Sequence, residues 1–483
     1  MVGVIVVLAA VTSFVGVQAI TKTGMFRVPG VVKFDESVSE SERAEVLALL
    51  SGENVELAND VTVSAAEYLT RPTLSEGEFL VGVSVPVGDF YALETDVGVE
   101  TPTALIQGAN GGGYEMIDVR ELGFTKRLYS VNGAYYLDDF DAGAVFRVLK
   151  FQSEKYEEEI APRVAETFTK TWPEKNSVLT LAQTGVTALS RNMNTKLSQV
   201  GGDGGYFAEG IGEWLSSYDL THTSNEASFT DAATGSNICA RPEFIDTLTG
   251  IGLDIVELTG NHNLDCGIDA AVETIDTYDS LGIKTVGGGR NADEAAVPLE
   301  ISEKGSRITF LAFNESTGGA TTGDYPGANQ YYDDVARRQI GEAKSRGDFV
   351  IVDVQYYECS DYDHEEEWTT CDAADSAAGD QVGLFRELID MGADVVVGTS
   401  AHQPQTYELY GDGAIYYGLG NLFFDQYWWP GTTRSLVLVH HFYKGKLLQT
   451  EIRPTVYDSA MQTRLMDEEG AKWYLSRLQN TRP

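Results

Sequence analysis

The chain of 483 residues is long enough for roughly two or three domains, each with its own core. Hydrophobic residues make up 43% of it, which excludes intrinsic disorder and fibrous repeats. It carries 73 acidic against 34 basic residues, and the formal net charge of −39 repels phosphate backbones and anionic lipid heads. Nucleic acid is therefore excluded as a partner. We interpret the acidity as a solubilising surface, with cation binding by acidic loops as the alternative.

The first segment, residues 1–20, is almost wholly apolar and predicts export. Val17-Gln18-Ala19 offers small residues where a signal peptidase would cleave, so removal after Ala19 and retention as a membrane anchor both stay open. Membrane contact is expected through this segment alone. We therefore place the protein outside the cell or in the cell envelope, and its oligomeric state stays open.

The four cysteines fit an exported protein. None of them has the C-x-x-C spacing of a zinc ribbon or a thioredoxin-type motif. We expect two disulfides, Cys239–Cys266 and Cys359–Cys371, with free buried thiols as the alternative.

Residues 30–172 predict a smaller α/β domain. Their pattern indicates a helix over Glu40–Leu50 and a strand over Phe79–Pro86. A charged helix is expected over residues 155–169, and Trp172-Pro173 marks the boundary with the next domain.

Residues 176–483 alternate strands and helices, which is typical of a layered α/β domain. Strands are expected over residues 178–185, 253–259, 348–356 and 393–398, and another ending near Asp219-Leu220. Helices are expected over residues 242–249, 268–281, 333–345 and 379–391. Antiparallel strands over Ser435–Tyr443 and residues 447–452 favour a mixed sheet over a purely parallel one. His440 and His441 are interpreted as structural, with at least one of them facing outward.

Polar residues follow the carboxyl ends of these strands, where α/β sheets bind their ligands. They are Asn225, Glu226, Asn261, His262, Gln355, Glu358, His402 and Asn421. The two histidines, His262 and His402, occupy equivalent places in successive strand–loop units, which indicates a functional cluster. Imidazole, amide and carboxylate groups could together hold a single divalent metal ion, and they could equally bind a polar ligand without any metal.

Seven short motifs, in the same order along the chain, resemble those of the CapA family, which is named for capsule and poly-γ-glutamate synthesis. They lie at residues 184–191 (TGVTALSR), 224–226 (SNE), 260–267 (GNHNLDCG), 287–289 (GGG), 355–358 (QYYE), 398–402 (GTSAH) and 417–421 (YGLGN). The resemblance covers residues 178–430. It implies a layered, mixed-sheet, metallophosphatase-like (calcineurin-like) α/β domain.

Three departures from the family pattern affect its metal ligands. Val186 stands where the family usually has Asp, Gln355 stands where a His is usual, and Thr399-Ser400 replaces residues of a His-rich block. A two-metal centre needs a bridging carboxylate and several imidazoles, which this set cannot supply. The metal ligands that the resemblance leaves are Glu226, Asn261, His262, Gln355 and His402.

Two hypotheses about function follow from this site. The first is an exported hydrolase that acts on a cell-surface polymer, either poly-γ-glutamate or a polysaccharide, with His262 or His402 as general acid or base. The second is a non-catalytic protein that binds or assembles such a polymer on the same scaffold. In both, the substrate-binding residues would be Arg191, Asn225, Glu358 and Asn421. The aromatic run Tyr427-Trp428-Trp429 suits stacking on sugars, with hydrophobic packing as the alternative.

Overall fold

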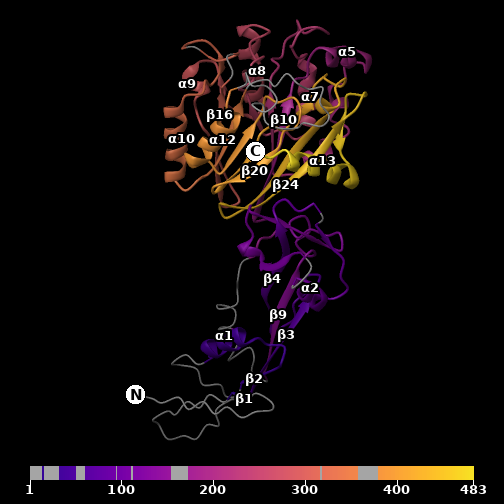
Figure 1. Ribbon diagram of the computed structural model, residues 1–483, viewed down its shortest axis with the longest axis vertical. Helices are drawn as coiled ribbons and strands as arrows, with labels where there is room; N and C mark the ends of the chain where they lie inside the picture. Colours follow the sequence, from indigo (N-terminus) through magenta and orange to yellow (C-terminus); the bar gives the residue numbers. More distant parts are fainter. Residues whose placement is uncertain are drawn as a thin grey trace. The chain divides into compact units, whose positions relative to one another are not determined.

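The computed structural model describes residues 14–15, 32–50, 60–93, 95–109, 113–153, 161, 172–315, 318–321, 323–356 and 379–483 (Figure 1). The chain divides into two compact units, one formed by Met1–Leu122 with Lys126–Lys175 and the other by Gly123–Thr125 with Asn176–Pro483. Four predictions fall outside the described residues, apart from residues 14–15 and 161. They are the segment 1–20, the helix over 155–169, Glu358 and the Cys359–Cys371 disulfide. No helix in the described ranges is both long and apolar enough to span a bilayer.

The first unit is built on one mixed sheet, with strands in the order β1-β2-β3-β9-β4-β6 and β7 beside β4. The strands are β1 (Phe14–Val15), β2 (Val32–Phe34), β3 (Val61–Tyr68), β4 (Glu78–Asp89), β6 (Glu115–Asp118), β7 (Lys126–Leu128) and β9 (Val145–Gln152). A separate pair is formed by β5 (Asp96–Val97) and β8 (Ser130–Val131). The helices are α1 (Glu40–Leu50), α2 (Pro102–Gly108) and the short η1 (Val119–Glu121).

Helix α1 connects the parallel strands β2 and β3 and has the predicted bounds. It buries Val46 and Leu50 in a core shared with Val63 and Phe151 of the sheet. Arg147 on β9 fixes the helix from the other end, because its Nε atom donates to Glu42 Oε1 over 2.6 Å. The predicted strand over residues 79–86 lies within β4.

The second unit contains two large mixed sheets. The first has the order β13-β12-β11-β10-β23-β24-β25, with β22 also beside β10, and the second has the order β15-β16-β18-β19-β21-β20. The first sheet comprises β10 (Val178–Thr187), β11 (Leu220–Asn225), β12 (Ile255–Glu257), β13 (Lys284–Val286), β22 (Asn421–Phe423), β23 (Arg434–Tyr443), β24 (Lys446–Tyr457) and β25 (Thr463–Leu465). The second comprises β15 (Leu299–Glu303), β16 (Ser306–Asn314), β18 (Phe349–Gln355), β19 (Val395–Gly398), β20 (Tyr407–Tyr410) and β21 (Gly413–Tyr416). A small pair joins β14 (Gly288–Gly289) to β17 (Gly327–Ala328).

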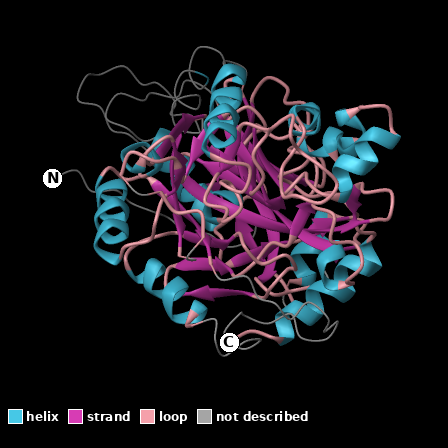
Figure 2. Ribbon diagram, turned by 90° about the horizontal axis from the view of Figure 1, so that it is seen from above, coloured by secondary structure: helices cyan, strands magenta, loops and turns pink. Residues whose placement is uncertain are grey.

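Helices cover the outer faces of these two sheets, as the cyan helices and magenta strands of Figure 2 show. They are α5 (Asn192–Gln199), η2 (Gly204–Ala208), α6 (Gly212–Leu215), η3 (Pro242–Phe244), α7 (Ile245–Gly250), α8 (Ile268–Leu281), α9 (Ala292–Ala295), α10 (Asp333–Ser345), α12 (Gln381–Asp390), η4 (Gly431–Thr433) and α13 (Glu468–Asn480). The predicted class, a layered mixed-sheet α/β domain preceded by a smaller α/β domain, is confirmed.

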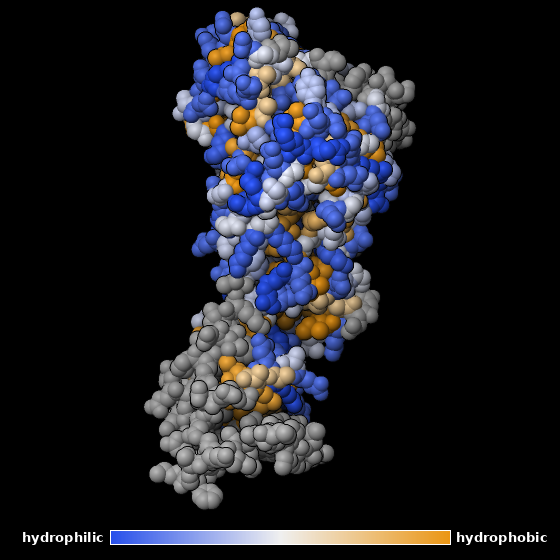
Figure 3. Space-filling model, turned by 90° about the vertical axis from the view of Figure 1, so that its left-hand side faces the viewer, coloured by the Kyte–Doolittle hydropathy of each residue, from blue (hydrophilic) through white to orange (hydrophobic). Residues whose placement is uncertain are grey.

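The outward helix faces carry much of the charge. On α10, Ala336, Ile340 and Ala343 are buried, while Asp334 and Arg338 on its other side are exposed. This is the pattern of a helix with one apolar stripe. The face of the molecule drawn in Figure 3 is accordingly hydrophilic over most of the second unit, with small scattered hydrophobic areas.

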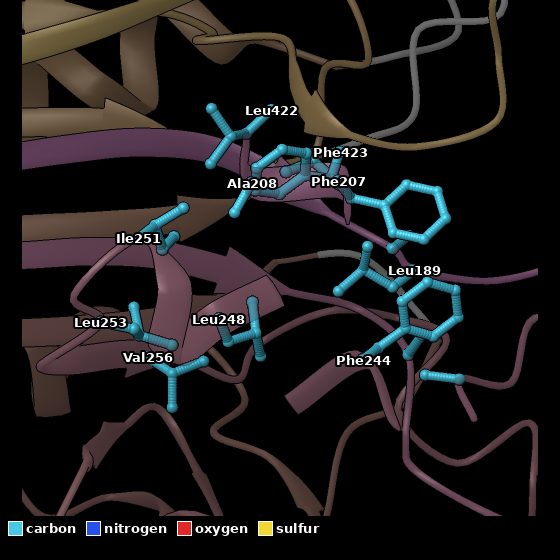
Figure 4. Close-up of a cluster of buried hydrophobic side chains, with 14 of the residues drawn as sticks. Leu189, Phe207, Ala208, Phe244, Leu248, Ile251, Leu253, Val256, Leu422 and Phe423 are labelled. Atoms are coloured by element: carbon cyan, nitrogen blue, oxygen red, sulfur yellow. The ribbon is translucent and has the colours of Figure 1, made fainter. Parts of the chain in front are cut away.

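The largest core of the second unit lies between the first sheet and its helices. Phe207 of η2, Leu248 of α7 and Val256 of β12 belong to this core, part of which Figure 4 draws. A second core lies between the other sheet and helices α10 and α12, and includes Ile340 and Val352. Since side chains alternate along a strand, the intervening residues of both sheets face each other in the middle layer.

Two local predictions were wrong. The residues near Asp219-Leu220 begin strand β11 and do not end it, and residues 220–225 are all buried. Their polar sequence, LTHTSN, hides the strand, because central parallel strands are usually recognised by continuous apolar runs. Neither His440 nor His441 faces solvent, since their exposed fractions are 0% and 1%. Strand β23 lies between β10 and β24 and is covered on both faces.

Candidate functional site

Most of the described site residues that were predicted lie at or just after the carboxyl ends of strands from both sheets, whereas Asn421 begins β22. In the first sheet Thr187 at the end of β10 pairs with Asn225 at the end of β11. In the second sheet Val354 of β18 pairs with Gly398 at the end of β19. Strand β22 joins this edge because its Asn421 pairs with Val186. Parallel pairing therefore brings loops that are far apart in the sequence to one end of the layered domain.

Three of these loops are joined by neutral side chains. Gln355, the last residue of β18, donates from Nε2 to Asn261 Oδ1 in the loop after β12, over 3.1 Å. Thr399, directly after β19, donates from Oγ1 to Gln355 Oε1 over 3.4 Å. The Gln355 amide is buried and uses both its ends on protein partners. Gln355 therefore serves as a bridge between the two sheets.

The neighbouring residues Asn225 and Glu226 are both buried, and they pack against different segments of the chain. Glu226 is fully buried against Gly260, where a Cβ atom would lie 2.6 Å from Glu226 Cγ, so the motif that begins with this glycine needs it for close packing. Asn225 donates from Nδ2 to the hydroxyl of Tyr278 on α8 over 2.9 Å. The Asn225 amide thus supports the packing of α8 on the sheet.

His402 is held by Asn421. The ring nitrogen Nδ1 donates to Asn421 Oδ1 over 2.9 Å, and both side chains are buried. Asn421 Nδ2 in turn donates to Gln426 Oε1 over 3.1 Å and to the carbonyl of Thr432 over 3.3 Å. The pair therefore fixes the loop that follows β22.

Arg191 is the cationic side chain of the predicted substrate site, and it is ion-paired. Its guanidinium donates to Asp425 Oδ1 from Nε over 2.9 Å and from Nη2 over 2.5 Å. It also lies 4.4 Å from the ring centroid of Phe424. The Arg191 side chain is 25% exposed and that of Asp425 only 1%, so the ion pair lies largely out of contact with water.

His262 is the more accessible of the two predicted histidines. In the turn after β12 its Nδ1 donates to Asp265 Oδ2 over 2.8 Å, and the two side chains are 24% and 41% exposed. A carboxylate on Nδ1 selects the tautomer that has its lone pair on Nε2. Cys266, the residue after Asp265, forms a disulfide with Cys239, so that predicted pairing is confirmed.

Behind the site, polar side chains cross the middle layer between the sheets. His222 Nε2 on β11 lies 3.1 Å from Asp353 Oδ2 on β18, and both side chains are 0% exposed. Gln183 on β10 donates from Nε2 to Asp353 Oδ1 over 2.6 Å. Its other end lies 3.2 Å from Nε2 of His440 on β23. We call these four residues the buried polar line.

The low dielectric of this layer changes two pKa values. Burial, followed by the charges of His441 and His222, lowers the pKa of His440 to about 3, so this ring is neutral at pH 7. Burial and the nearby Asp353 carboxylate raise the pKa of Glu257, which accepts hydrogen bonds from the backbone and hydroxyl of Thr259.

The predicted metal ligands do not form a complete metal site. In the part of the chain that the structure describes, no three His, Cys, Asp or Glu side chains are grouped so that they could hold a metal ion. Of the predicted ligands, Gln355 and Asn261 are bonded to each other, and His402 is bonded to Asn421. Three of the five predicted ligands, Asn261, Gln355 and His402, therefore have protein side chains as partners.

Sequence reasoning missed the partners that orient the site. Asp265 orients His262, Asp425 neutralises Arg191, and Thr399 bridges to Gln355. Asp265 stands three residues after its histidine, a spacing that a tight turn brings together, so the pattern contained a signal. The His222–Asp353 pair had none, because it joins strands of different sheets.

Known proteins are similar in sequence to the part of the chain that contains the candidate site. The family described as "Bacterial capsule synthesis protein PGA_cap" matches residues 180–426. The capsule biosynthesis protein CapA of Bacillus anthracis is 25% identical over 55% of this chain and 64% of its own length. The PGA biosynthesis protein CapA of Bacillus subtilis (strain 168) is 26% identical over 44% of this chain and 53% of its own. The chain thus spans between about half and two thirds of these curated relatives.

Among solved structures, a putative 5'-nucleotidase from Staphylococcus aureus is similar over 62% of this chain and 58% of its own, with 14% identity and a TM-score of 0.33. That superposition is loose, so the fold assignment rests on the two sheets themselves. The family match spans just over half of the chain and includes every described residue of the candidate site. The chain belongs to the bacterial capsule synthesis protein PGA_cap family.

Proposed function

We propose that this protein takes part in the synthesis of an extracellular polymer of the capsule or poly-γ-glutamate class, and that its site binds polymer without two-metal hydrolysis. The family and its relatives support the polymer class. One observation carries the absence of two-metal chemistry: Gln355, at the centre of the predicted ligand set, is bonded at both ends to neutral side chains. A residue so engaged positions loops and does not polarise a phosphoryl or carbonyl oxygen.

Export is part of this proposal. The Cys239–Cys266 disulfide supports it, because such bonds form and persist in oxidising compartments. The apolar segment 1–20 would direct the chain there, either as a cleaved signal or as an anchor.

The test separates binding from cleavage. Purified protein is incubated with poly-γ-glutamate and with capsular polysaccharide, with and without EDTA, and polymer binding and polymer length are measured by sedimentation and light scattering. We expect binding that survives EDTA and leaves the polymer length unchanged. Shortening of either polymer that stops on chelation would contradict the proposal.

A metal-free hydrolase is the second candidate, favoured by the His262–Asp265 pair. A carboxylate on Nδ1 and the lone pair on Nε2 match the arrangement of a general base oriented by an acid. In this case polymer length would fall in the presence of EDTA, and Asp265→Asn would slow the cleavage by about a hundredfold or more.

A further inference from the structure

Three consecutive aromatic residues, two exposed and one half-buried, lie on the loop that follows Asn421 of the candidate site. We call Tyr427, Trp428 and Trp429 the aromatic platform. Tyr427 is 40% exposed and Trp428 is 46% exposed, and the ring centroids of these two lie 5.4 Å apart. Trp428 and Trp429 are also 5.4 Å apart, at an interplanar angle of 62°. Covering exposed indole and phenol rings with a binding partner is favourable, because it removes apolar surface from water.

Hydrogen bonds connect the loop that carries the aromatic platform to a residue of the candidate site. Thr432 donates from Oγ1 to the carbonyls of Gln426 and Trp429, which closes the loop below the rings. The carbonyl of the same threonine accepts from Asn421, the residue that orients His402. The aromatic rings therefore stand on a pre-organised loop, and a ligand that covers them has less chain to order on binding.

Charge decides what kind of polymer suits this surface. The chain carries a formal net charge of −39. Arg191, the guanidinium of the predicted substrate site, is already paired with Asp425. A polyanion such as poly-γ-glutamate would meet repulsion without a compensating free cation from this pair. Pyranose rings need none, because the C–H groups on their flat faces pack against indole rings.

We propose that the aromatic platform binds a neutral glycan segment of the surface polymer, with Trp428 as the main stacking residue. This inference rests on the proposed function and names the class of polymer that the site holds. Direct stacking by Trp428 predicts that its removal weakens glycan binding by about tenfold or more, with no change in folding.

The chain offers a matched control. Trp473 on α13 is 45% exposed, nearly the same as Trp428, but belongs to a different cluster in which it stacks with Arg434 and Arg477. Binding of cellohexaose, chitohexaose, maltohexaose and γ-linked hexaglutamate is measured by calorimetry for wild type, Trp428→Ala and Trp473→Ala. Thermal unfolding of each variant checks the fold, and sedimentation checks the mass.

The inference predicts that wild type binds at least one of the neutral hexasaccharides, that Trp428→Ala loses this binding and that Trp473→Ala keeps it. Tighter binding of hexaglutamate than of any sugar, or unchanged sugar binding by Trp428→Ala, would overturn the inference and leave the proposed function standing. Self-association of wild type that Trp428→Ala abolishes would overturn it as well, because the platform would then be covered by a second copy. If wild type binds neither these oligomers nor the long polymers, the proposed function itself is contradicted.

Discussion

Two histidine–aspartate pairs in the second unit consist of the same residue types and lie in opposite surroundings. His222–Asp353 joins the two sheets, and both of its side chains are 0% exposed. His262–Asp265 lies in a turn at the end of the same layers, with exposed fractions of 24% and 41%. A buried pair has lost its water and depends on its partner, whereas an exposed pair can exchange that partner for a ligand. We therefore propose that the first pair stabilises the fold and that the second pair is the one available to a ligand.

The largest expected effect separates the two pairs directly. Asp353→Ala removes the acceptor of the Gln183 amide and the buried carboxylate beside His222, so the free energy of unfolding should fall by about 3–5 kcal/mol. Asp265→Ala removes an exposed partner and should cost less than about 1 kcal/mol. Urea unfolding of both variants measures the difference. Equal losses would show that exposure does not distinguish the pairs.

The exposed pair sits on a turn that a disulfide holds. Replacing Cys239 and Cys266 by Ser opens a loop of 27 residues in sequence separation and should lower the free energy of unfolding by about 3 kcal/mol. Amide hydrogen exchange around His262 should accelerate in this variant, while exchange around His222 should not. Uniform acceleration at both sites would mean that the turn is not a separate unit.

An ion pair between these extremes should show an intermediate effect. Arg191→Ala strands the Asp425 carboxylate, which is 1% exposed, and should cost roughly 1–3 kcal/mol. Adding Asp425→Ala should recover part of this loss, since the stranded charge is then gone. A double-mutant cycle in urea measures the coupling, and additive losses would contradict a direct interaction.

Per pH unit, the smallest effect is the pH dependence that the buried polar line should give to the free energy of unfolding. The pKa of His440 is about 3 in the folded chain and about 6.5 when unfolded, so between these values only the unfolded chain binds the proton. Lowering the pH from 6.5 should therefore reduce the free energy of unfolding, by up to about 1.4 kcal/mol per unit. The variant His440→Gln should lack this part of the slope. Parallel pH profiles for the two proteins would show that His440 is not buried in its neutral form.

The sequence allowed the layers to be predicted because their signals are local. Helix α8 has the expected bounds Ile268–Leu281, since its apolar residues recur at helical spacing and Gly282 ends it. Strand β18 was found from an almost continuous apolar run. Strand β11 was misplaced, because its buried side chains are mainly polar and find their partners across the sheets.

The candidate site could be predicted only in part. The positions of the strand ends predicted His262 and His402 as site residues, but they did not predict the hydrogen-bond partners of these two side chains. Asp425 and Asn421 make their contacts over long sequence separations, with Arg191 and His402 respectively. Such pairs depend on strand order and register, which one sequence does not specify.

The most direct test of the account is the metal content of the purified protein. Wild type and the double variant His262→Ala/His402→Ala are compared by elemental analysis after dialysis against divalent metal ions, with circular dichroism to confirm that both are folded. We expect no stoichiometric metal in either protein, because the described site joins amides to each other and groups no three strong ligands. Stoichiometric metal in wild type that the double variant loses would contradict the account and restore a metal-assisted hydrolase.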